Sequence, residues 1–476
     1  MQQGLKKNLI ILAALAVVLF AGLNATAQYF EQAEIKPVSS ILVVPFVLLL
    51  AAIAIVPFIS RYWWEHNYPK VSYALGALIV LYYIVILNNV PRLLLTFHEY
   101  VSFISLIGSL FVVAGGIHLD IRGKSAPYEN VLLLGFGAII SNLLGTTGAA
   151  MLLIRPYLRI NKFRIKAYHI VFFIFIVANV GGALTPIGDP PLFLGYLKGV
   201  PFFWVVTRVW HIWGLAVLAL LAVFFVIDTY SFRKAKAAAR EEAAVPDKPE
   251  FSGLHNIAYL LIILGAVFIS HPIMLREVIM WGAAFASYYT TKRSVHEKNE
   301  FNFIPIKEVA ILFAGIFATM IPALDWLELN SQSLGIVSPA QYYWGTGILS
   351  SVLDNAPTYL NFLSAAFGLH GASVDNLGHM KAILGIATPG SLGLPVPLKE
   401  GMVAITADTW RYVQAISVAA VFFGACTYIG NGPNFMVKSI AEQAKVDCPS
   451  FFGYITKYTL PILIPLYAII WLFFFL

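Results

Sequence analysis

Two carboxylates in this chain lie in apolar stretches, where either could bind a cation or a proton. Asp189 belongs to the segment TPIGDPPLF (185–193), and Asp354 belongs to SSVLDNAPT (350–358). A carboxylate at the centre of a membrane costs about 2.5–3.5 kcal/mol on an insertion scale, so it persists where it pairs, binds a cation or takes up a proton. The alternative role for each is a helix cap, in which the carboxylate accepts backbone N–H groups.

The segment around Asp189 occurs a second time near the end of the chain. Residues 427–435 read TYIGNGPNF, which matches 185–193 at five of nine positions and places Asn431 opposite Asp189. Both copies contain Gly and Pro, which interrupt helices, late in a long apolar stretch. A repeated helix interruption of this kind indicates the binding site of a secondary transporter.

Small polar side chains near these carboxylates could supply further oxygen ligands to a hard cation such as sodium. The candidate binding residues are Asn142, Thr146, Thr147, Thr185 and Asp189 in the first half and Asp354, Asn355, Thr427, Asn431 and Asn434 in the second half. Backbone carbonyls freed at the interruptions would complete a sodium site at the two carboxylates. Each Thr and Asn has the alternative role of satisfying local backbone groups.

The composition predicts an integral membrane protein. Apolar residues make up 59% of the 476 residues and charged residues 12%, whereas soluble domains carry about 25% charged residues. Several apolar runs reach the ~20 residues that a helix needs to cross a bilayer, so we expect an all-α, multi-pass membrane protein. The net charge of +7 arises in the loops between these runs, which indicates membrane orientation and not nucleic-acid binding.

We expect ten spanning helices and two further apolar stretches with polar centres. The helices are predicted at about 41–60, 71–90, 100–118, 167–194, 208–227, 255–271, 273–290, 306–324, 412–437 and 454–475. The two further stretches, 130–154 and 342–367, contain SNLLGTTG and SSVLDNAP at their middles.

The first of these stretches has basic residues on both sides. Arg122 and Lys124 precede 130–154, and five Arg or Lys residues follow it within 155–166. Because cytoplasmic loops carry an excess of Lys and Arg, both ends of this stretch are predicted to be cytoplasmic. A segment with both ends on one side is a re-entrant hairpin, whose tip lies inside the membrane and is buried in protein.

The second stretch has the opposite charge bias. Asp325 and Glu328 precede 342–367, and a charge-poor region rich in Gly and Pro, 368–411, follows it. Both ends should therefore lie outside the cell. Since each hairpin is followed by a broken helix with one copy of the repeated segment, we expect an inverted-topology repeat.

The repeat divides the chain into five parts. The first repeat is predicted at 71–227 and the second at 273–476, with a cytoplasmic linker and connecting helix at 228–272 between them. Residues 28–70 form an N-terminal helix with loops. Residues 1–27 resemble both a secretory signal with an Ala-Thr-Ala cleavage site and a short first helix, and both interpretations stay open.

The motifs resemble those of the ion transporter superfamily. ANVGGALTPIGDPP (178–191) is similar to the signature of NhaD-type sodium/proton antiporters, and the Asp-Asn-x-Pro run in 350–358 resembles their second-hairpin motif. The stretch 188–204 also resembles the citrate-transporter branch of the superfamily. The resemblance covers the chain from about residue 71 onward. It implies an elevator-like motion of hairpins and broken helices against a scaffold, and a homodimer.

Two features depart from the NhaD-type pattern. Pro190 and Pro191 follow the Gly-Asp pair where that family has Val and threonines, and Gly145 stands in the first hairpin where that family has an Asp. The prolines leave the subfamily open, and the missing Asp leaves the coupling ratio open.

We therefore expect secondary active ion transport, in the form of sodium/proton antiport with Asp189 and Asp354 as the exchanging groups. The alternative is a sodium-coupled carrier of citrate or a dicarboxylate, since Ser141-Asn142 resembles the neutral hairpin tips of such carriers. Two ionised carboxylates would repel a bound carboxylate, which favours the antiporter.

The same observations predict the partners and the location, and the family resemblance adds the second copy of the chain. No nucleotide-binding motif, intramembrane protease motif or metal-ligand cluster is recognisable in the sequence, so we expect neither an ATP-driven pump nor an enzyme. Sodium and protons serve as transported or coupling ions, and no cofactor is expected. The expected partners are small ions or a carboxylate, the lipid bilayer and a second copy of the chain, in an inner (plasma) membrane of the bacterial type.

Overall fold

The computed structural model describes residues 33–120, 125–234, 250–387 and 402–476. Residues 1–27, with their predicted signal or first helix, lie outside this part. Within it nearly all regular structure is helical, and eight helical segments are long and apolar enough to cross a membrane. The predicted fold class, an all-α polytopic membrane protein, is therefore confirmed.

Seven of these eight segments overlap predicted spans, and the eighth, Pro127–Ile160, corresponds to the predicted hairpin stretch 130–154. The eight segments are Ser40–Ile59, Arg61–Val85, Val90–Gly115, Pro127–Ile160, Ala167–Leu184, Phe202–Lys234, Ile304–Leu334 and Phe451–Phe474, and shorter apolar helices cover Asn256–Ala266 and Trp410–Cys426. The predicted bounds 71–90 and 100–118 are wrong. A new helix begins at Val90, because the Asn89 side chain accepts the N–H of Arg92 and caps its N-terminus.

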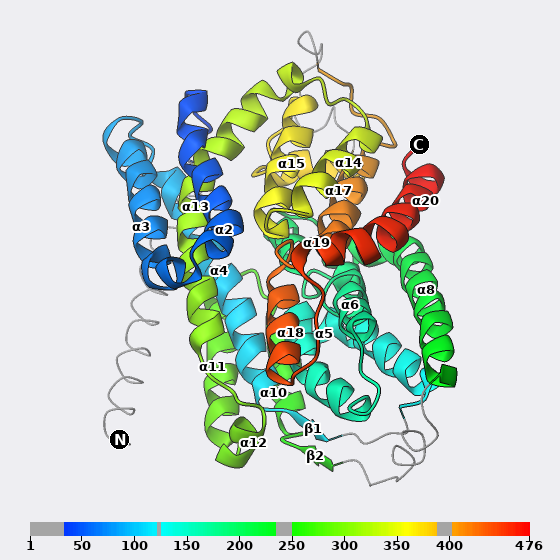
Figure 1. Cartoon of the computed structure of the whole chain (residues 1–476). Helices are drawn as coiled ribbons and strands as arrows, with labels where there is room; N and C mark the ends of the chain where they lie inside the picture. The colour runs from blue at the N-terminus through cyan, green and yellow to red at the C-terminus, as the bar shows by residue number, and fades with distance from the viewer. Residues whose placement is uncertain (1–32, 121–124, 235–249, 388–401) are drawn as a thin grey trace.

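One group of helices packs along one flank of the molecule (Figure 1). Its members are η2 (Ser40–Val43), α2 (Val44–Ile59), α3 (Arg61–Val85), α4 (Val90–Gly115), α10 (Asn256–Ala266), α11 (Leu275–Thr290), α12 (Arg293–Lys298), α13 (Ile304–Asn330) and η4 (Ser331–Leu334). Small residues bring α3 and α13 close together, since a Cβ on Gly315 would lie 2.2 Å from the Ser72 hydroxyl. Such small-residue contacts are typical of helix packing in membranes.

The second group contains the hairpins and the broken helices. It begins with α5 (Pro127–Ile160), α6 (Ala167–Ile176), η3 (Val180–Leu184), α7 (Pro190–Leu197) and α8 (Phe202–Lys234). It continues with α14 (Pro339–Ser350), α15 (Asn355–Leu369), α16 (Leu377–Ile383), α17 (Trp410–Phe423), η6 (Gly424–Cys426), α18 (Gly432–Gln443), α19 (Phe451–Tyr454), a π-helical segment η7 (Ile455–Leu463) and α20 (Ile464–Phe474).

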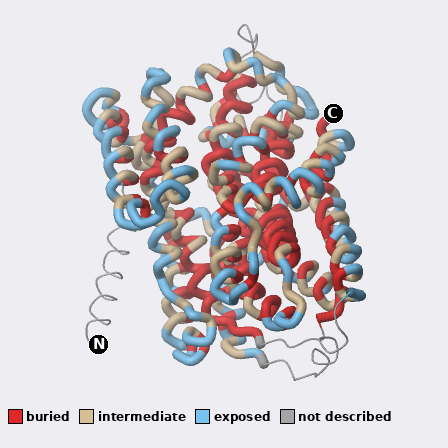
Figure 2. The backbone as a smooth tube through the Cα atoms, viewed as in Figure 1, coloured by how far each residue is buried: buried red, intermediate tan, exposed pale blue. Residues whose placement is uncertain are grey.

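The two hairpin regions occupy opposite halves of the molecule. In Figure 1, α14, α15 and α17 lie in the upper half, whereas α5, α6 and α18 lie in the lower half. Helix α6 is apolar on all sides and runs through the core, where Ile170–Ala178 are completely buried (Figure 2). A helix with apolar residues on every face is stable only in such surroundings.

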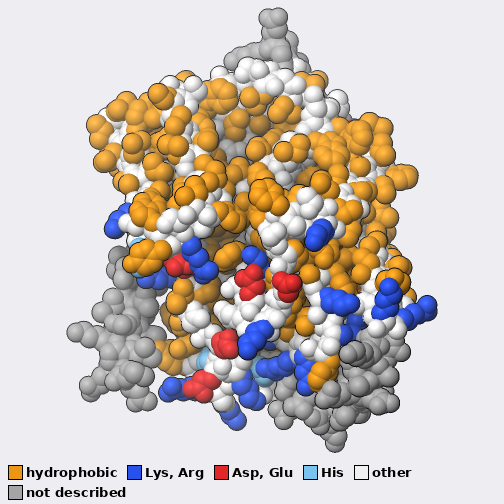
Figure 3. All heavy atoms as spheres, in the orientation of Figure 1, with side chains coloured by type: hydrophobic (Ala, Val, Ile, Leu, Met, Phe, Trp, Pro, Cys, Tyr) orange, Lys and Arg blue, Asp and Glu red, His pale blue; other side chains and the backbone are white. Residues whose placement is uncertain are grey.

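Two short strands join the linker region to α4. β1 (His118–Asp120) pairs antiparallel with β2 (Glu250–Ser252), with His118 opposite Ser252. The residue pattern predicts no strand there, because three residues are too few to show a period of two. Lys and Arg side chains gather at this end of the molecule in Figure 3, and hydrophobic side chains cover most of the remaining face.

Candidate ion-binding site

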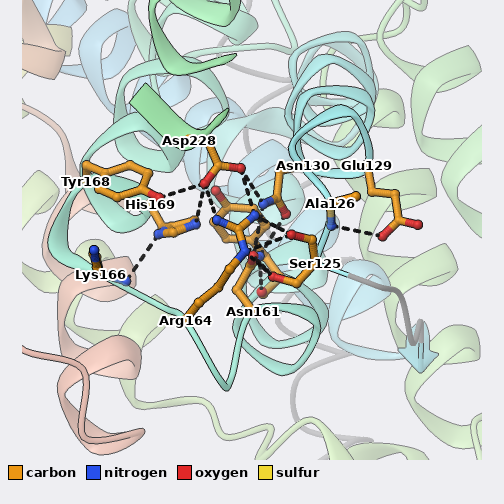
Figure 4. Close-up of polar contacts among 11 residues, drawn as sticks. Ser125, Ala126, Glu129, Asn130, Asn161, Arg164, Lys166, Tyr168, His169 and Asp228 are labelled. Carbon is orange, nitrogen blue, oxygen red and sulfur yellow. Dashed lines mark hydrogen bonds and ion pairs between the residues drawn. The ribbon is translucent and has the colours of Figure 1, made fainter. Parts of the chain in front are cut away.

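Helix α5 doubles back at Gly145. This residue has φ 74° and ψ 157°, a conformation that is open to glycine and strained for other residues. The two ends of α5 consequently meet: the side-chain amides of Asn130 and Asn161 hydrogen bond reciprocally at 2.9 and 2.8 Å (Figure 4). α5 is thus a helical hairpin, the geometry that a re-entrant segment needs; its side of entry stays a prediction.

An ionic cluster around Asp228 of α8 closes the base of this hairpin (Figure 4). Its carboxylate pairs with Arg164 and accepts hydrogen bonds from Tyr168 at 2.6 Å and from Asn130 at 3.0 Å. His169 Nε2 lies 3.2 Å from the same carboxylate, while its Nδ1 accepts the N–H of Lys166. The base therefore connects both ends of α5 to α6 and α8.

The second hairpin consists of α14 and α15. The two helices are joined by residues 351–354, and Tyr412 of α17 stacks edge-on against both Tyr342 and His370 at the far end. The Asp354 carboxylate accepts the N–H of Ala356 at 3.0 Å and caps α15. The capping alternative is thus realised for Asp354, and a role in ion binding stays a prediction.

The two copies of the repeated segment have equivalent local structures. Thr185 and Thr427 each donate their hydroxyl to a hairpin carbonyl at 2.6 Å, that of Asn142 and that of Ser351 respectively. Each hydroxyl also accepts the N–H of the glycine three residues later at 3.1 Å. Asp189 and Asn431 then occupy the same position, immediately before α7 and α18.

Side chains from three other parts of the chain converge on Asp189. Its Oδ1 accepts hydrogen bonds from Thr146 Oγ1 at 2.7 Å and from Asn431 Nδ2 at 3.1 Å. Its Oδ2 accepts one from Asn355 Nδ2 at 2.5 Å. Both hairpin tips and both broken helices therefore meet at one carboxylate, which is 1% exposed.

No cationic side chain pairs with Asp189 among the described residues, although three other buried carboxylates have such partners. Asp325 pairs with Arg92 at 2.7 Å, Glu99 with Lys198 at 2.6 Å and Glu277 with Arg276 at 2.7 Å. The three side chains that donate to Asp189 in the described part of the chain are all neutral. An ionised carboxylate there has no counter-charge, which is the electrostatic requirement of a cation site.

A cavity of about 30 Å³ borders Asp189. Thr146, Thr147 and the turn Pro186–Gly188 line it on one side, and apolar residues of α4 line it on the other. A water molecule needs about 10–15 Å³ of such space, so the cavity can hold a monatomic ion or one or two waters. It is too small for citrate in this conformation.

The remaining predicted residues bind backbone groups near the site. Asn142 accepts the N–H of Leu184 at 2.9 Å and donates to Gly181 O at 2.7 Å. Asn434 donates to Gly424 O and to Thr427 O, both at 2.8 Å. These side chains hold the broken helices in shape. Thr147 is partly buried, and it is one of the residues that line the cavity.

Two kinds of residue near the site are missing from the sequence-based set. Asn179 donates to Asn434 Oδ1 at 2.7 Å, and its own Oδ1 accepts a hydrogen bond from Asn431 Nδ2 at 3.2 Å, so it connects the two broken helices. Its position directly before Gly181-Gly182, at the helix interruption, could have identified it. Arg92 and Lys198 are buried as well, and their charge within apolar sequence is a comparable signal.

Comparisons with known proteins relate this chain to membrane transporters. The model of the family described as "Putative citrate transport" matches residues 35–475. The chain belongs to this family. Two similar proteins are uncharacterized transporters of Mycobacterium bovis and Mycobacterium tuberculosis, each 24% identical over 334 residues, which is 68% of this chain and 71% of the relative.

The family match decides two of the predictions. It agrees with the resemblance to the citrate-transporter branch of the ion transporter superfamily. Together with the names of the relatives, it confirms a membrane transporter and not an enzyme.

Among the described residues no group of three or more His, Cys, Asp or Glu could hold a metal ion. A sodium site would therefore combine Asp189 with hydroxyl, amide and carbonyl oxygens.

Proposed function

We propose that this protein is a secondary active transporter that exchanges sodium for protons at Asp189. The observation that carries the proposal is a buried carboxylate with three neutral donors and no cationic partner in the described chain. A bound sodium ion or a proton would each neutralise the carboxylate. Because the two compete for the same oxygens, binding of one releases the other, which is the basis of exchange.

Asn355 supports this proposal with a second observation. Its Oδ1 is buried and has no hydrogen-bond partner among the described residues, although its Nδ2 touches the Asp189 carboxylate. An unsatisfied amide oxygen beside a carboxylate is unfavourable for hydrogen bonding and well suited to an alkali cation. Asn355 would therefore provide an oxygen ligand from the second hairpin, next to Asp189.

The second candidate is sodium-coupled transport of citrate or a related carboxylate. The family match favours it, and the same sodium site would serve as its coupling site. The small cavity and the neutral donors at Asp189 favour the antiporter. In either case we propose the inner membrane of a bacterial-type cell as the location, and a homodimer as the assembly.

The test is the substitution Asp189→Asn, which matches the natural Asn431 of the other repeat. The Asn355 amide can turn over so that its free oxygen accepts the new amide, which should preserve the fold. Sodium-induced proton flux and uptake of labelled citrate are measured in the same proteoliposomes. We expect wild-type protein to exchange sodium for protons and Asp189→Asn to lose that exchange.

Each other outcome points elsewhere. Proton exchange that persists in Asp189→Asn contradicts the assignment of Asp189. Citrate uptake by wild-type protein without proton exchange would favour the carboxylate carrier. Asp189→Glu is the matched control, because it keeps the charge and should retain exchange with a changed apparent affinity for sodium.

A further inference from the structure

A short helix connects Asp189 to a buried ionic cluster. Asp189 precedes α7 and Lys198 follows it, so the two residues mark the ends of an eight-residue helix. Such a helix is about 12 Å long. A displacement of Lys198 would therefore move Asp189, since a helix this short moves as one rigid unit.

Lys198 is buried and pairs with carboxylates of two other segments. Its Nζ lies 2.6 Å from Glu99 of α4 and 2.5 Å from Asp375, which follows α15. Arg92 extends the cluster, at 2.5 Å from Asp375 and 2.7 Å from Asp325 of α13. The C-terminal end of α7 is thus tied to α4, to α13 and to the segment after the second hairpin.

α7 and α15 form a pair with polar contacts at both ends. At one end Asn355 donates to Asp189 at 2.5 Å, and at the other end Lys198 binds Asp375. Between them the helices touch, because a Cβ on Gly195 would lie 2.2 Å from the Tyr359 hydroxyl. The relative position of the two helices determines whether Asn355 reaches Asp189.

We propose that Lys198 is a positioning residue for the ion site, whose ion pairs with Glu99 and Asp375 hold Asp189 in place against Asn355. This inference rests on the proposed function, in which Asp189 binds sodium. A buried ion pair contributes little net stability compared with apolar packing, and its better-attested effect is to specify one geometry. The cluster is therefore expected to act on ion affinity more than on folding.

The test uses neutral variants of similar shape: Lys198→Met, Glu99→Gln and the double variant Glu99→Gln/Lys198→Met. The single variant Lys198→Met leaves a buried carboxylate without its partner and can fail to fold. The double variant removes one charge of each sign and avoids that problem. We measure the sodium concentration for half-maximal flux, and the thermal unfolding temperature, for each variant.

We expect the sodium concentration for half-maximal flux to rise about 10- to 100-fold in the double variant, the range typical of residues that orient the ligands of a cation. Lys198→Arg, which keeps the charge, should stay near wild type. Thr319→Val is the control for a general loss of stability, because the buried Thr319 hydroxyl donates to backbone carbonyls of its own helix α13 and to no other group among the described residues.

Unchanged sodium affinity in the folded double variant, with or without a lower unfolding temperature, would reduce the cluster to a structural role and overturn the proposal. So would an equal loss of affinity in Thr319→Val. The measurement uses whichever sodium-dependent flux wild-type protein shows, proton exchange or citrate uptake. Failure of the antiport proposal is therefore visible in wild-type protein, separately from failure of the positioning proposal.

Discussion

Asp189 and Asp354 look alike in the sequence and have different contacts in the structure. Asp189 receives three side-chain donors and is fully buried, whereas Asp354 is partly buried and caps α15 through the N–H of Ala356. The cap satisfies one carboxylate oxygen, and no charged side chain in the described part of the chain pairs with Asp354. The contacts thus give Asp189 the central position among the hairpin tips and broken helices.

Replacement of Asp354 by Asn separates its charge from its capping role. Asn is as good a helix cap as Asp, so the bond to Ala356 N and the stability of the protein should persist. We predict that Asp354→Asn nevertheless abolishes sodium/proton exchange in proteoliposomes, because the second exchangeable charge is gone. Exchange at the wild-type rate in a folded Asp354→Asn protein would show that the residue is a cap and no more.

The residue types at the site were predictable, but their pairing was not. Thr146, Asn355 and Asn431 are candidates from sequence alone, and the structure brings all three to Asp189. These contacts join residues 43, 166 and 242 positions apart. Sequence spacing gives no information on contacts between residues so far apart in the chain. Which polar side chains bind Asp189 and which bind backbone groups is therefore known only from the fold.

At the scale of elements, apolar length predicted most helices and failed where polar residues belong to them. α3 begins at Arg61 and includes Glu65, His66 and Asn67 before its apolar part. A hydropathy window starts later for that reason. We propose that the two repeated segments belong to the two halves of an inverted repeat. The equivalent hydrogen bonds of Thr185 and Thr427 support this proposal.

The interruption at Gly145 gives a test of the first hairpin. An alanine at this position would have to adopt φ 74°, and its Cβ would lie 3.3 Å from the carbonyl oxygen of Ile187. We predict that Gly145→Ala lowers stability by about 1–3 kcal/mol, the cost of placing a residue with a side chain in a backbone conformation that is essentially restricted to glycine, and displaces Thr146 from Asp189. Thermal unfolding in detergent and sodium affinity should both decline.

Gly135 is the matched control for that substitution. It lies in the first half of α5, and the nearest atom to an added Cβ is a leucine methyl at 3.6 Å. Gly135→Ala should therefore be neutral or stabilising, since alanine favours helix. Equal behaviour of the two variants would mean that the interruption at Gly145 does not depend on glycine.

At the scale of the whole molecule, the charges used to assign topology have more than one role. Asp325 and Glu328 precede the second hairpin and favour an outside location, yet both are buried in the structure, and Asp325 binds Arg92 and Tyr83. Arg164, counted among the cytoplasmic charges, closes the base of the first hairpin. The charge rule uses only the positions of charged residues along the chain. It cannot distinguish a charge that is solvated in a loop from a charge that is buried in an ion pair.

The predicted topology is therefore best tested directly. We predict that the two hairpins open to opposite sides of the membrane, since their helices occupy opposite halves of the molecule (Figure 1). Lys162, after the first hairpin, and Lys381, after the second, are both exposed. Cysteines at these two positions should react with an impermeant maleimide from opposite faces of oriented vesicles.

The background for this measurement is low, because Cys426 is buried and only the partly exposed Cys448 needs replacement by serine. Lys292→Cys provides a same-side control: it is exposed, it lies between α11 and α12, and the charge rule places it in the cytoplasm together with Lys162. Labelling of Lys162→Cys and Lys381→Cys from one face would rule out the inverted arrangement. It would leave the contacts at Asp189 intact but require another account of how sodium reaches them from each side.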